Sequence, residues 1–512
     1  MRPCDSILGT NRFTAGTRPG CSTNPPPRDP APESTRISDH ALGRTSGAEL
    51  REGNSLVLLR NGYATFADWL RAIRGAERWI HLENYIFFDG EIGRAFADAL
   101  AERVEAGVTV RVLYDWYGSW DANTTLWRDL RAKGVDVRTI NPPQLSEPLG
   151  VLRRDHRKLL AVDGVYGSVG GVGIADPWLH EDPESGLPYR DTCVAVTGPA
   201  VADIEAAFAG VWDLNGTPLP DAERPKAEEI AATGQTRARV LIQEPGKMRV
   251  SRLLQVLTAS VEDRIWIADA YFLADRILRE ALIAAALDGI DVRLLLPSTN
   301  GLRLFGAISR ASVRPLLEAG ARIWEYSGPM MHAKTIIADG WCARVGSTNL
   351  NLTGLMTNWE IDVIVQDVEF GLLMEEMFLD DLNHAEELTL DGRKVRGGSG
   401  RRRMRGLATG AGPQGTTSVA SLGTALAQGA LSDALSRSER KFDAGAGAAA
   451  LVGALVIAKF PRLFALPVAA VLGMFAATGL ARALRIGRHP RGTGGPARNH
   501  EVNAQRADAR EH

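Results

Sequence analysis

MMHAKTIIADG, residues 330–340, carries three ionisable residues in a mostly apolar run. Their spacing is His-x-Lys-x-x-x-x-Asp, followed by Gly, and it recurs within RRDHRKLLAVDGVYGSVGG, residues 153–171. The six residues of the two motifs are His156, Lys158, Asp163, His332, Lys334 and Asp339. One occurrence among nine histidines would be a modest coincidence, whereas two occurrences indicate an internal duplication.

The two motifs predict one pocket that carries two imidazoles and two ammonium groups. Side chains two residues apart on a strand point to the same face, so the His and Lys of each motif would project together. Such a pocket suits a phosphate diester, because lysines can neutralise its oxygens while one imidazole attacks phosphorus and the other protonates the leaving alcohol. We expect no metal and no cofactor, since the fixed cations would supply the electrostatic stabilisation. A single motif could equally be a core histidine beside a lysine with a buried stem, but the duplication argues against that.

The aspartates of the motifs have a structural interpretation. Asp163 and Asp339 each precede a glycine, and Asp is favoured in hairpin turns because its side chain bonds nearby backbone groups. We therefore expect both aspartates to build turns rather than to take part in the chemistry.

A strand, helix, strand pattern also occurs twice, at residues 78–119 and again at residues 264–301. Strands that are apolar nearly throughout suit a sheet covered on both faces, and the intervening helices indicate right-handed crossovers between parallel strands. The predicted fold class is α/β, with two similar lobes that each contain a mostly parallel sheet flanked by helices.

Composition and pattern divide the chain into seven segments. We predict a disordered N-terminal segment at 1–50, a first lobe at 51–222, a linker at 223–235, a second lobe at 236–392, a basic and Gly/Ala/Ser-rich linker at 393–442, a transmembrane hairpin at 443–482 and a polar tail at 483–512. The run NPPPRDPAPES makes the first segment unsuited to a packed core.

Composition also argues against several classes of protein. Acidic and basic residues nearly cancel over the 512 residues, leaving a net charge of −2, so no chain-wide field would attract nucleic acid. The four cysteines are scattered without a CxxC pair, which argues against a disulfide framework or a zinc site. The N-terminal residues lack the apolar run of a secretory signal.

Two uncharged stretches near the C-terminus, residues 444–458 and 463–481, indicate membrane helices. The second approaches the roughly 20 residues that span a bilayer, and the pair would form a hairpin turning at Pro461. Basic residues on both flanks favour the cytoplasm, so we expect a protein of the cell membrane whose lobes are cytoplasmic. A single span, or buried helices of a small soluble domain, are the alternatives. The basic linker could rest on anionic lipid headgroups or be merely solvated.

The two motifs resemble those of the phospholipase D superfamily, and the overall plan is similar to its cardiolipin synthase-like bacterial branch over residues 50–392. The stretch DGWCARVGSTNLNLTGLMTNWEID, residues 339–362, is similar to the second half-site of that family. The resemblance implies that Asn349 donates a hydrogen bond to the substrate phosphate and that Ser347 lines the pocket.

The same resemblance implies a carboxylate partner for each histidine. Glu360 would orient His332 through its second ring nitrogen, which fixes the tautomer that leaves the other nitrogen for chemistry. Asp191 would do the same for His156.

The first half-site departs from the family pattern. Where the family has GGxN, this chain has GGVG at residues 170–173, so the asparagine donor is missing. Gly171 and Gly173 would then contact the phosphate through backbone groups alone. Glu83 and Asp115 also match positions that are acidic in the branch, but polar residues at strand ends are ordinary.

By resemblance, the protein is a phosphatidyltransferase with a phosphohistidine intermediate. His156 would attack the phosphodiester, and His332 would protonate the departing alcohol and then activate the acceptor. Phosphatidylglycerol as donor and acceptor would yield cardiolipin, whereas water as acceptor would make the enzyme a phospholipase D-type hydrolase. A nuclease or phosphodiesterase and an inactive lipid-binding scaffold are the alternatives, the scaffold because of Gly173. We expect a phospholipid partner and no nucleic acid, and the oligomeric state stays open.

Overall fold

The computed structural model describes residues 37–120, 122, 124–142, 153–183, 185–298, 303–391 and 394–397. The chain divides into two compact units, Met1–Gly429 and Ala430–His512, and every described residue lies in the first. The predicted membrane hairpin at 443–482, the polar tail and most of the basic linker lie outside the described residues. Among the helices that are described, none combines the length and the apolar character needed to cross a bilayer.

The first half of this unit alternates strands and helices. Its strands are β1 (Arg51–Arg60), β2 (Trp79–Asn84), β3 (Thr109–Asp115), β4 (Asp136–Ile140), β5 (Lys158–Val162), β6 (Tyr166–Gly170) and β7 (Thr192–Thr197). Its helices are α2 (Asn61–Arg74), α3 (Glu91–Glu105), α4 (Thr124–Ala132), the 3-10 turn η4 (Asp176–Trp178) and α5 (Val201–Leu214). The short 3-10 turns η5 (Asp221–Glu223) and η6 (Ala227–Glu229) lead to the second half.

The second half repeats this order. Its strands are β8 (Thr236–Gln243), β9 (Arg264–Asp269), β10 (Asp291–Pro297), β11 (Arg322–Tyr326), β12 (Lys334–Ala338), β13 (Cys342–Gly346) and β14 (Glu360–Gln366). Its helices are α6 (Arg249–Ser260), α7 (Arg276–Leu287), α8 (Arg303–Glu318), the π-helical turn η7 (Thr353–Thr357) and α9 (Val368–Leu382).

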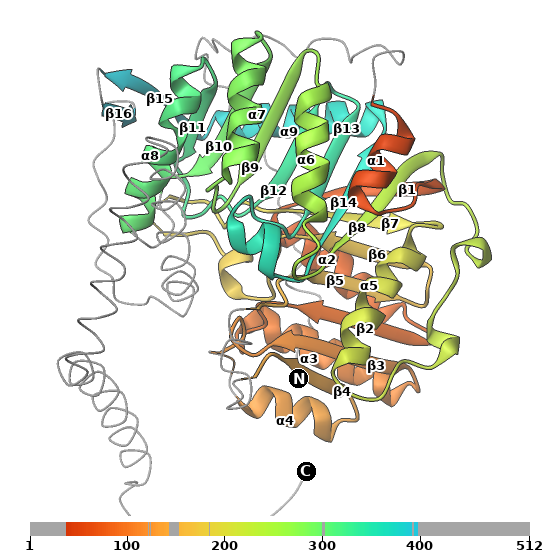
Figure 1. Cartoon of the computed structure of the whole chain (residues 1–512). Coiled ribbons are helices and arrows are strands. Elements are labelled where there is room, and N and C mark those ends of the chain that lie inside the picture. Colours follow the sequence, from red (N-terminus) through yellow and green to blue (C-terminus); the bar gives the residue numbers. More distant parts are fainter. Residues whose placement is uncertain are drawn as a thin grey trace, which may run out of the picture. The chain divides into compact units, whose positions relative to one another are not determined.

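The described strands belong to one hydrogen-bonded series, in which the order from β11 to β8 matches the order from β4 to β1 (Figure 1). From β11 the order runs β10-β9-β12-β13-β14-β8, and it continues as β1-β7-β6-β5-β2-β3-β4. The two first strands, β1 and β8, pair antiparallel at the centre, with Arg51 opposite Ala238. A pseudo-two-fold axis therefore relates the halves.

The strand, helix, strand units predicted from the sequence are confirmed, but the expectation of a mostly parallel sheet is wrong. Parallel pairs join β2 to β3, β3 to β4, β9 to β10 and β10 to β11. The other pairs among the described strands are antiparallel. Helical crossovers join parallel strands only as far as β4 in the first half and β11 in the second. Later strands such as β5 and β6 are joined by short hairpin connections, which make neighbouring strands antiparallel. The fold is thus mixed α/β.

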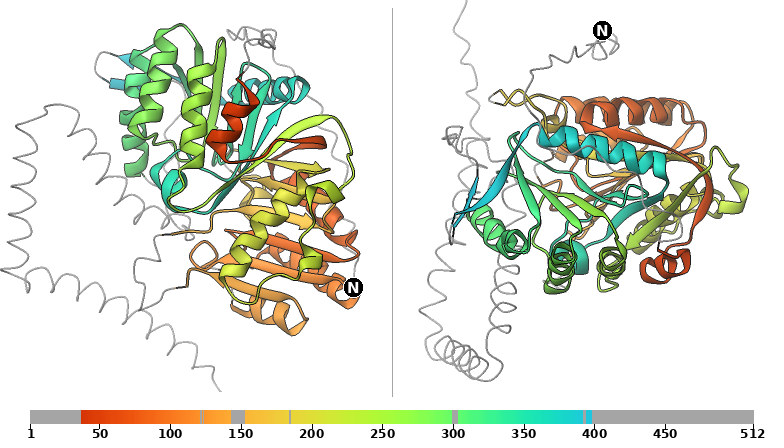
Figure 2. Two further views of the ribbon diagram at one scale, coloured as in Figure 1. Left: turned by 45° about the vertical axis from the view of Figure 1, so that its right-hand side comes forward. Right: turned by 90° about the horizontal axis from the view of Figure 1, so that it is seen from above.

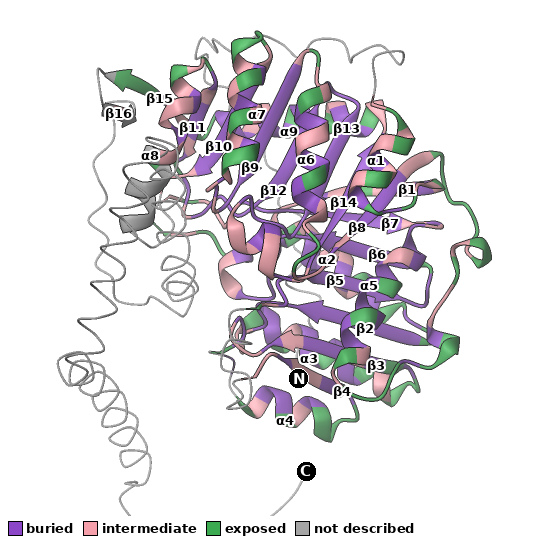
Figure 3. Ribbon diagram, viewed as in Figure 1, coloured by how far each residue is buried: buried purple, intermediate pink, exposed green. Residues whose placement is uncertain are grey.

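Three apolar cores explain why the strands are apolar on both faces. One core packs the first half against α2, α3 and α4, and another packs the second half against α6, α7 and α8. The third is shared by both halves and contains residues of α5 and α9. We call the core that contains α6, α7 and α8 the outer core. Along β12, Ile336 belongs to this outer core and Ile337 belongs to the shared core. Figure 2 shows helices on both sides of the strands, and Figure 3 shows the strands mostly buried.

Two predicted segments differ at their edges. The segment 1–50 was expected to be disordered, yet helix α1 (Asp39–Ser46) forms within it because Ser38 caps its first turn and Leu42 is buried in the outer core. The linker expected from residue 393 begins with strand β16 (Lys394–Gly397), which pairs with β15 (Ala385–Asp391).

Candidate active site

The histidine and lysine of each motif lie at the start of a buried hairpin strand. His156 and His332 each precede by two residues the lysine that begins β5 or β12. The ammonium of Lys158 donates to the carbonyl of His156 at 2.6 Å, and Lys334 donates in the same way to His332. All four side chains are buried.

The aspartates of the motifs build turns, as predicted. Asp163 and Asp339 have φ angles of 55° and 50°, in the left-handed region that Asp tolerates better than most residues. Each carboxylate also accepts three backbone N–H groups at the start of a neighbouring strand. The donors are Glu77, Arg78 and Trp79 at 2.8 Å for Asp163, and Glu262, Asp263 and Arg264 at 2.9 Å for Asp339.

Each histidine is held by a carboxylate from the other half of the molecule. His156 Nδ1 lies 3.0 Å from Glu360 Oε2, and His332 Nδ1 lies 2.7 Å from Asp191 Oδ2. The sequence interpretation, which assigned Glu360 to His332 and Asp191 to His156, is therefore wrong in its pairing. The two carboxylates that it chose are nevertheless the ones that contact the histidines.

Backbone hydrogen bonds between the halves explain the exchange. The N–H of His156 donates to Trp359, immediately before Glu360, at 3.0 Å. The N–H of His332 donates to Arg190, immediately before Asp191, at 2.7 Å. The two histidine segments thus lie close to the pseudo-two-fold axis, where the carboxylate across the interface is the nearer one.

Burial and charge fix the tautomer of both rings. Burial opposes the ionisation of Glu360 and Asp191, but the adjacent histidines and lysines outweigh it and hold both carboxyl pKa values below the ordinary range. An ionised carboxylate only accepts hydrogen bonds, so each Nδ1 carries the proton that it donates. Nε2 of His156 and of His332 is therefore the nitrogen left for chemistry.

The lysines and histidines share one electrostatic environment. Burial lowers the pKa of Lys158 to about 7 and that of Lys334 to about 8. Burial also lowers the pKa of both histidines, with that of His332 at about 3, and each lysine contributes to the lowering at both rings. Near pH 7 both imidazoles of the unliganded site are therefore neutral, and each lysine is cationic at pH values below its lowered pKa. A neutral imidazole beside cationic lysines is the arrangement that a nucleophile and a phosphate require.

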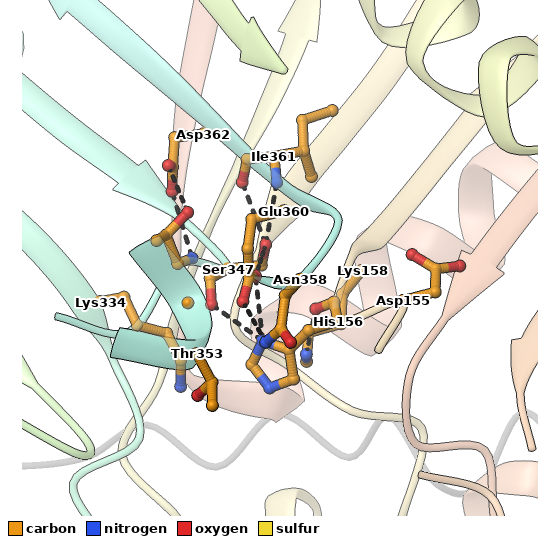
Figure 4. A network of polar contacts seen from close by, with 12 residues as sticks. Asp155, His156, Lys158, Lys334, Ser347, Thr353, Asn358, Glu360, Ile361 and Asp362 are labelled. Atoms are coloured by element: carbon orange, nitrogen blue, oxygen red, sulfur yellow. Dashed lines mark hydrogen bonds and ion pairs between the residues drawn. The ribbon is translucent and has the colours of Figure 1, made fainter. Parts of the chain in front are cut away.

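The two carboxylates are supported by different groups. Ser347 Oγ donates to Glu360 Oε2 at 2.6 Å, and Asn358 Nδ2 donates to Glu360 Oε1 at 3.0 Å (Figure 4). The carbonyl of Ser347 also lies 3.1 Å from His156 Nδ1. Ser347, expected to line the pocket for the phosphate, thus acts on the carboxylate.

In the other half-site, Gly171 stands where the second half has Ser347. A Cβ atom at Gly171 would lie 2.1 Å from Asp191 Oδ1, so only glycine leaves room for this carboxylate. The N–H of Gly171 donates to Thr192 at 3.1 Å, so the expected phosphate contact through that N–H is not supported. The hydroxyl that Ser347 supplies is replaced by the indole of Trp178, whose Nε1 donates to Asp191 Oδ2 at 2.8 Å.

The predicted phosphate contacts at the next position differ between the halves. Asn349 is buried at 7% exposure, and its Oδ1, a hydrogen-bond acceptor, has no partner among the described residues. A phosphate only accepts hydrogen bonds, so the expected contact of Asn349 with a phosphate would use its Nδ2 and stays a prediction. At Gly173, a Cβ atom would lie 3.0 Å from Ile86 and 3.1 Å from the Trp178 ring.

The two acidic residues at the strand ends, Asp115 and Glu83, are both buried. Asp115 accepts the N–H groups of Tyr117 and Gly118, and its other oxygen accepts the N–H of Asp155 at 3.0 Å, which holds the residue before His156. Glu83 is fully buried, and burial raises its pKa well above the ordinary value.

Comparisons with known proteins agree with this geometry. A family model described as "Cardiolipin synthase, PLD-like domain" matches residues 253–382. The cardiolipin synthase of Geobacillus thermodenitrificans is 34% identical over 359 residues, which cover 69% of this chain and 69% of that protein. The chain belongs to the cardiolipin synthase branch of the phospholipase D superfamily. The probable cardiolipin synthase YwiE of Bacillus subtilis is 30% identical over 390 residues, covering 72% of this chain and 75% of its own.

A solved structure of another protein has a fold similar to that of this chain. Phosphatidylserine synthase of Haemophilus influenzae aligns with a TM-score of 0.54 at 14% identity, covering 69% of this chain and 92% of its own. The superfamily recognised from the two motifs is confirmed by the family model and by the two curated relatives.

Sequence reasoning missed two residues that act on the carboxylates of this branch member. Asn358 stands two positions before Glu360, in a place that a strand pattern would assign to the same face. Trp178 ends the short 3-10 turn η4, five positions after the GGVG stretch, and no motif marks it.

Proposed function

We propose that this chain is a phosphatidyltransferase that makes cardiolipin through a phosphohistidine intermediate. The observation that carries the proposal is the crossed pair of histidine–carboxylate contacts, which presents two neutral Nε2 atoms beside two lysines in one buried site. Membership of the cardiolipin synthase branch supports phosphatidylglycerol as the substrate. The reaction would take place at the cell membrane, where this lipid resides.

In the first step, Nε2 of His156 attacks the phosphorus of phosphatidylglycerol, and the bond from phosphorus to the glycerol oxygen breaks. The ring charge that develops on His156 is stabilised by Glu360, which accepts the Nδ1 proton in a hydrogen bond. Lys158 and Lys334 neutralise the phosphoryl oxygens.

His332 supplies the proton for the departing glycerol. Its pKa is about 3 in the unliganded site, so it takes up a proton only when the phosphate anion balances the neighbouring lysines. Asp191 stabilises the imidazolium that results. After the glycerol has left, His332 is neutral at Nε2 and ready to act as a base.

In the second step, the hydroxyl of another phosphatidylglycerol attacks the phosphohistidine. His332 takes the hydroxyl proton, the bond from phosphorus to His156 breaks, and cardiolipin leaves. Water in place of the lipid hydroxyl would give phosphatidic acid by the same path. The scaffold alternative finds no support, since both histidines, both lysines and both carboxylates are in contact.

The test is incubation of the purified full chain with phosphatidylglycerol in mixed micelles, followed by mass spectrometry of the products. Cardiolipin and glycerol in equal amounts are expected, and His156→Ala and His332→Ala should each abolish them. Phosphatidic acid without cardiolipin would make the protein a hydrolase, and intact lipid with the wild-type chain would overturn both activities.

The two histidines are distinguished by a trapping experiment. A phosphatidyl substrate with a p-nitrophenol leaving group needs little protonation, so His332→Ala should still form a covalent intermediate that His156→Ala cannot form. The reverse pattern would exchange the two roles.

A further inference from the structure

Trp178 sits at the centre of the difference between the two half-sites. Counted from the histidine of each motif, Trp178 stands at the same distance as Gly354 of the second half. The second half therefore offers no tryptophan here, and its carboxylate receives the Ser347 hydroxyl instead. The first half has a longer loop, since Asp191 comes 35 positions after His156, whereas Glu360 comes 28 positions after His332.

The longer loop fixes the tryptophan on several sides. It forms the short turn η4, whose Asp176 side chain accepts the N–H groups of Glu91 and Ile92 at the start of α3. The Tyr189 ring packs edge-on against the indole, with centroids 5.1 Å apart. Gly62 of α2 leaves room for the Trp178 backbone, because a Cβ there would lie 2.2 Å from the Trp178 carbonyl. Trp178 itself is 1% exposed.

The indole touches both members of the His332 pair. Its Nε1–H donates to Asp191 Oδ2 at 2.8 Å, the same oxygen that receives His332 Nδ1 at 2.7 Å. Its ring packs edge-on against the His332 imidazole, with centroids 5.2 Å apart and planes at 85°. The second hydrogen bond restricts rotation of the Asp191 carboxylate, and the packed indole restricts rotation of the His332 ring.

The indole also occupies the space beside Gly173. A Cβ at Gly173 would lie 3.1 and 3.2 Å from two carbons of the Trp178 ring. The second half has Asn349 at the equivalent position, so the first half has no room for an amide there while Trp178 is present.

We propose that Trp178 is a positioning residue for His332. Trp178 holds Asp191 by a hydrogen bond, and Asp191 orients the His332 ring. Ser347 in the same way holds the carboxylate of Glu360 that orients His156. The same indole fills the space beside Gly173, where the second half has Asn349. This inference rests on the proposed function for its substrate.

The test compares variants that remove the N–H donor and keep the packing. Trp178→Phe keeps an aromatic ring, and replacement of Trp178 by 3-benzothienylalanine keeps the bicyclic shape with sulfur in place of N–H. Both are expected to lower kcat on phosphatidylglycerol by about 10- to 100-fold, the effect of losing a hydrogen bond to a charged group, with KM nearly unchanged. Trp127→Phe is the matched control, because Trp127 is also buried in the first half but packs against Phe87 and Tyr114.

A second readout separates positioning from packing. The burst of p-nitrophenol from the activated substrate reports the first chemical step, which needs no proton from His332. Both Trp178 variants should show a burst rate close to that of the wild type, whereas Ser347→Ala, which acts on the His156 side, should slow the burst.

Three outcomes would overturn the inference. They are wild-type kcat in the benzothienylalanine variant, equal slowing of burst and turnover in both Trp178 variants, and a loss of the same size in Trp127→Phe. If the wild type forms no cardiolipin, the proposed function fails, but the steady-state turnover of the p-nitrophenyl substrate after the burst, which uses His332 as the base, still decides whether Trp178 positions His332.

Discussion

At the scale of single residues, each histidine of the site depends on a carboxylate from the other half of the chain. Glu360 and Asp191 each act on a histidine that is encoded in the other half. The effect of changing a carboxylate should therefore follow the contact in space and not the order of the motifs along the chain.

Glu360→Gln should impair the step that depends on His156, and Asp191→Asn the step that depends on His332. Loss of the acceptor frees the wrong tautomer, and we expect kcat to fall by about 100- to 10,000-fold in both variants. With the p-nitrophenyl substrate, the burst should be lost in Glu360→Gln and kept in Asp191→Asn. A burst that survives in Glu360→Gln and disappears in Asp191→Asn would restore the pairing within each half.

The lysines predict the dependence of the reaction on pH. Lys158 and Lys334 must be protonated to neutralise the phosphate, and burial lowers their pKa values to about 7 and about 8. Because the cationic form is lost as pH rises, kcat/KM on a soluble short-chain substrate should fall as pH rises through this range. Lys158→Arg keeps its charge at these pH values, so the remaining fall should move toward the pKa of Lys334. An unchanged profile in that variant would contradict the assignment.

The same residues show what the sequence could predict about the site. The repeated spacing identified His156 and His332, and resemblance identified Asp191 and Glu360. Which carboxylate meets which histidine depends on backbone pairing between segments that lie far apart in the chain, and no local pattern reports that pairing. Trp178 was missed for a similar reason, since its contact with Asp191 is made by an irregular loop.

At the scale of secondary-structure elements, the hairpins of the motifs depend on Asp163 and Asp339. Each aspartate combines a left-handed backbone with three accepted hydrogen bonds, so it joins a turn to the start of the neighbouring strand. Local sequence was enough to predict the turn because Asp-Gly favours it. Local sequence was not enough to predict that most strand pairs are antiparallel, because strand direction depends on which connections are helical crossovers and which are hairpins.

Asp163→Ala should lower the free energy of unfolding by about 3 kcal/mol, from lost hydrogen bonds to a charged acceptor and from a strained φ angle. Urea unfolding of the full chain in detergent, followed by tryptophan fluorescence, measures the change. Asp163→Asn, which tolerates the φ angle and keeps an acceptor, should lose less. The specific activity of the folded Asp163→Ala protein should stay close to that of the wild type, and its abolition would instead indicate a catalytic role.

At the scale of the whole molecule, one buried ion pair holds the halves in register beside the site. Arg190 Nε lies 2.8 Å and 2.9 Å from the two oxygens of Asp381, and both residues are buried. Arg190 also accepts the N–H of His332 and immediately precedes Asp191. The interface between the halves and the active site are therefore one structure.

Asp381→Asn should leave the Arg190 guanidinium buried beside a neutral side chain. The free energy of unfolding should fall by about 3 kcal/mol, near the lower bound for breaking a buried ion pair. Activity should fall at temperatures where the protein is still folded, because Arg190 places Asp191. The control is Asp380→Asn, next in sequence and half-exposed, whose pair with Arg60 should contribute less than about 1 kcal/mol. Equal effects of the two variants on stability and turnover would argue against this coupling.

The matching strand order of the two halves has a consequence for ancestry. Two identical copies of one half, placed about a two-fold axis, would exchange their carboxylates just as the halves of this chain do. A half-length ancestor would then have been complete only as a symmetric pair. Fusion into one chain would then have let the two copies diverge, and the loop that carries Trp178 is an asymmetry that a pair of identical copies could not have had.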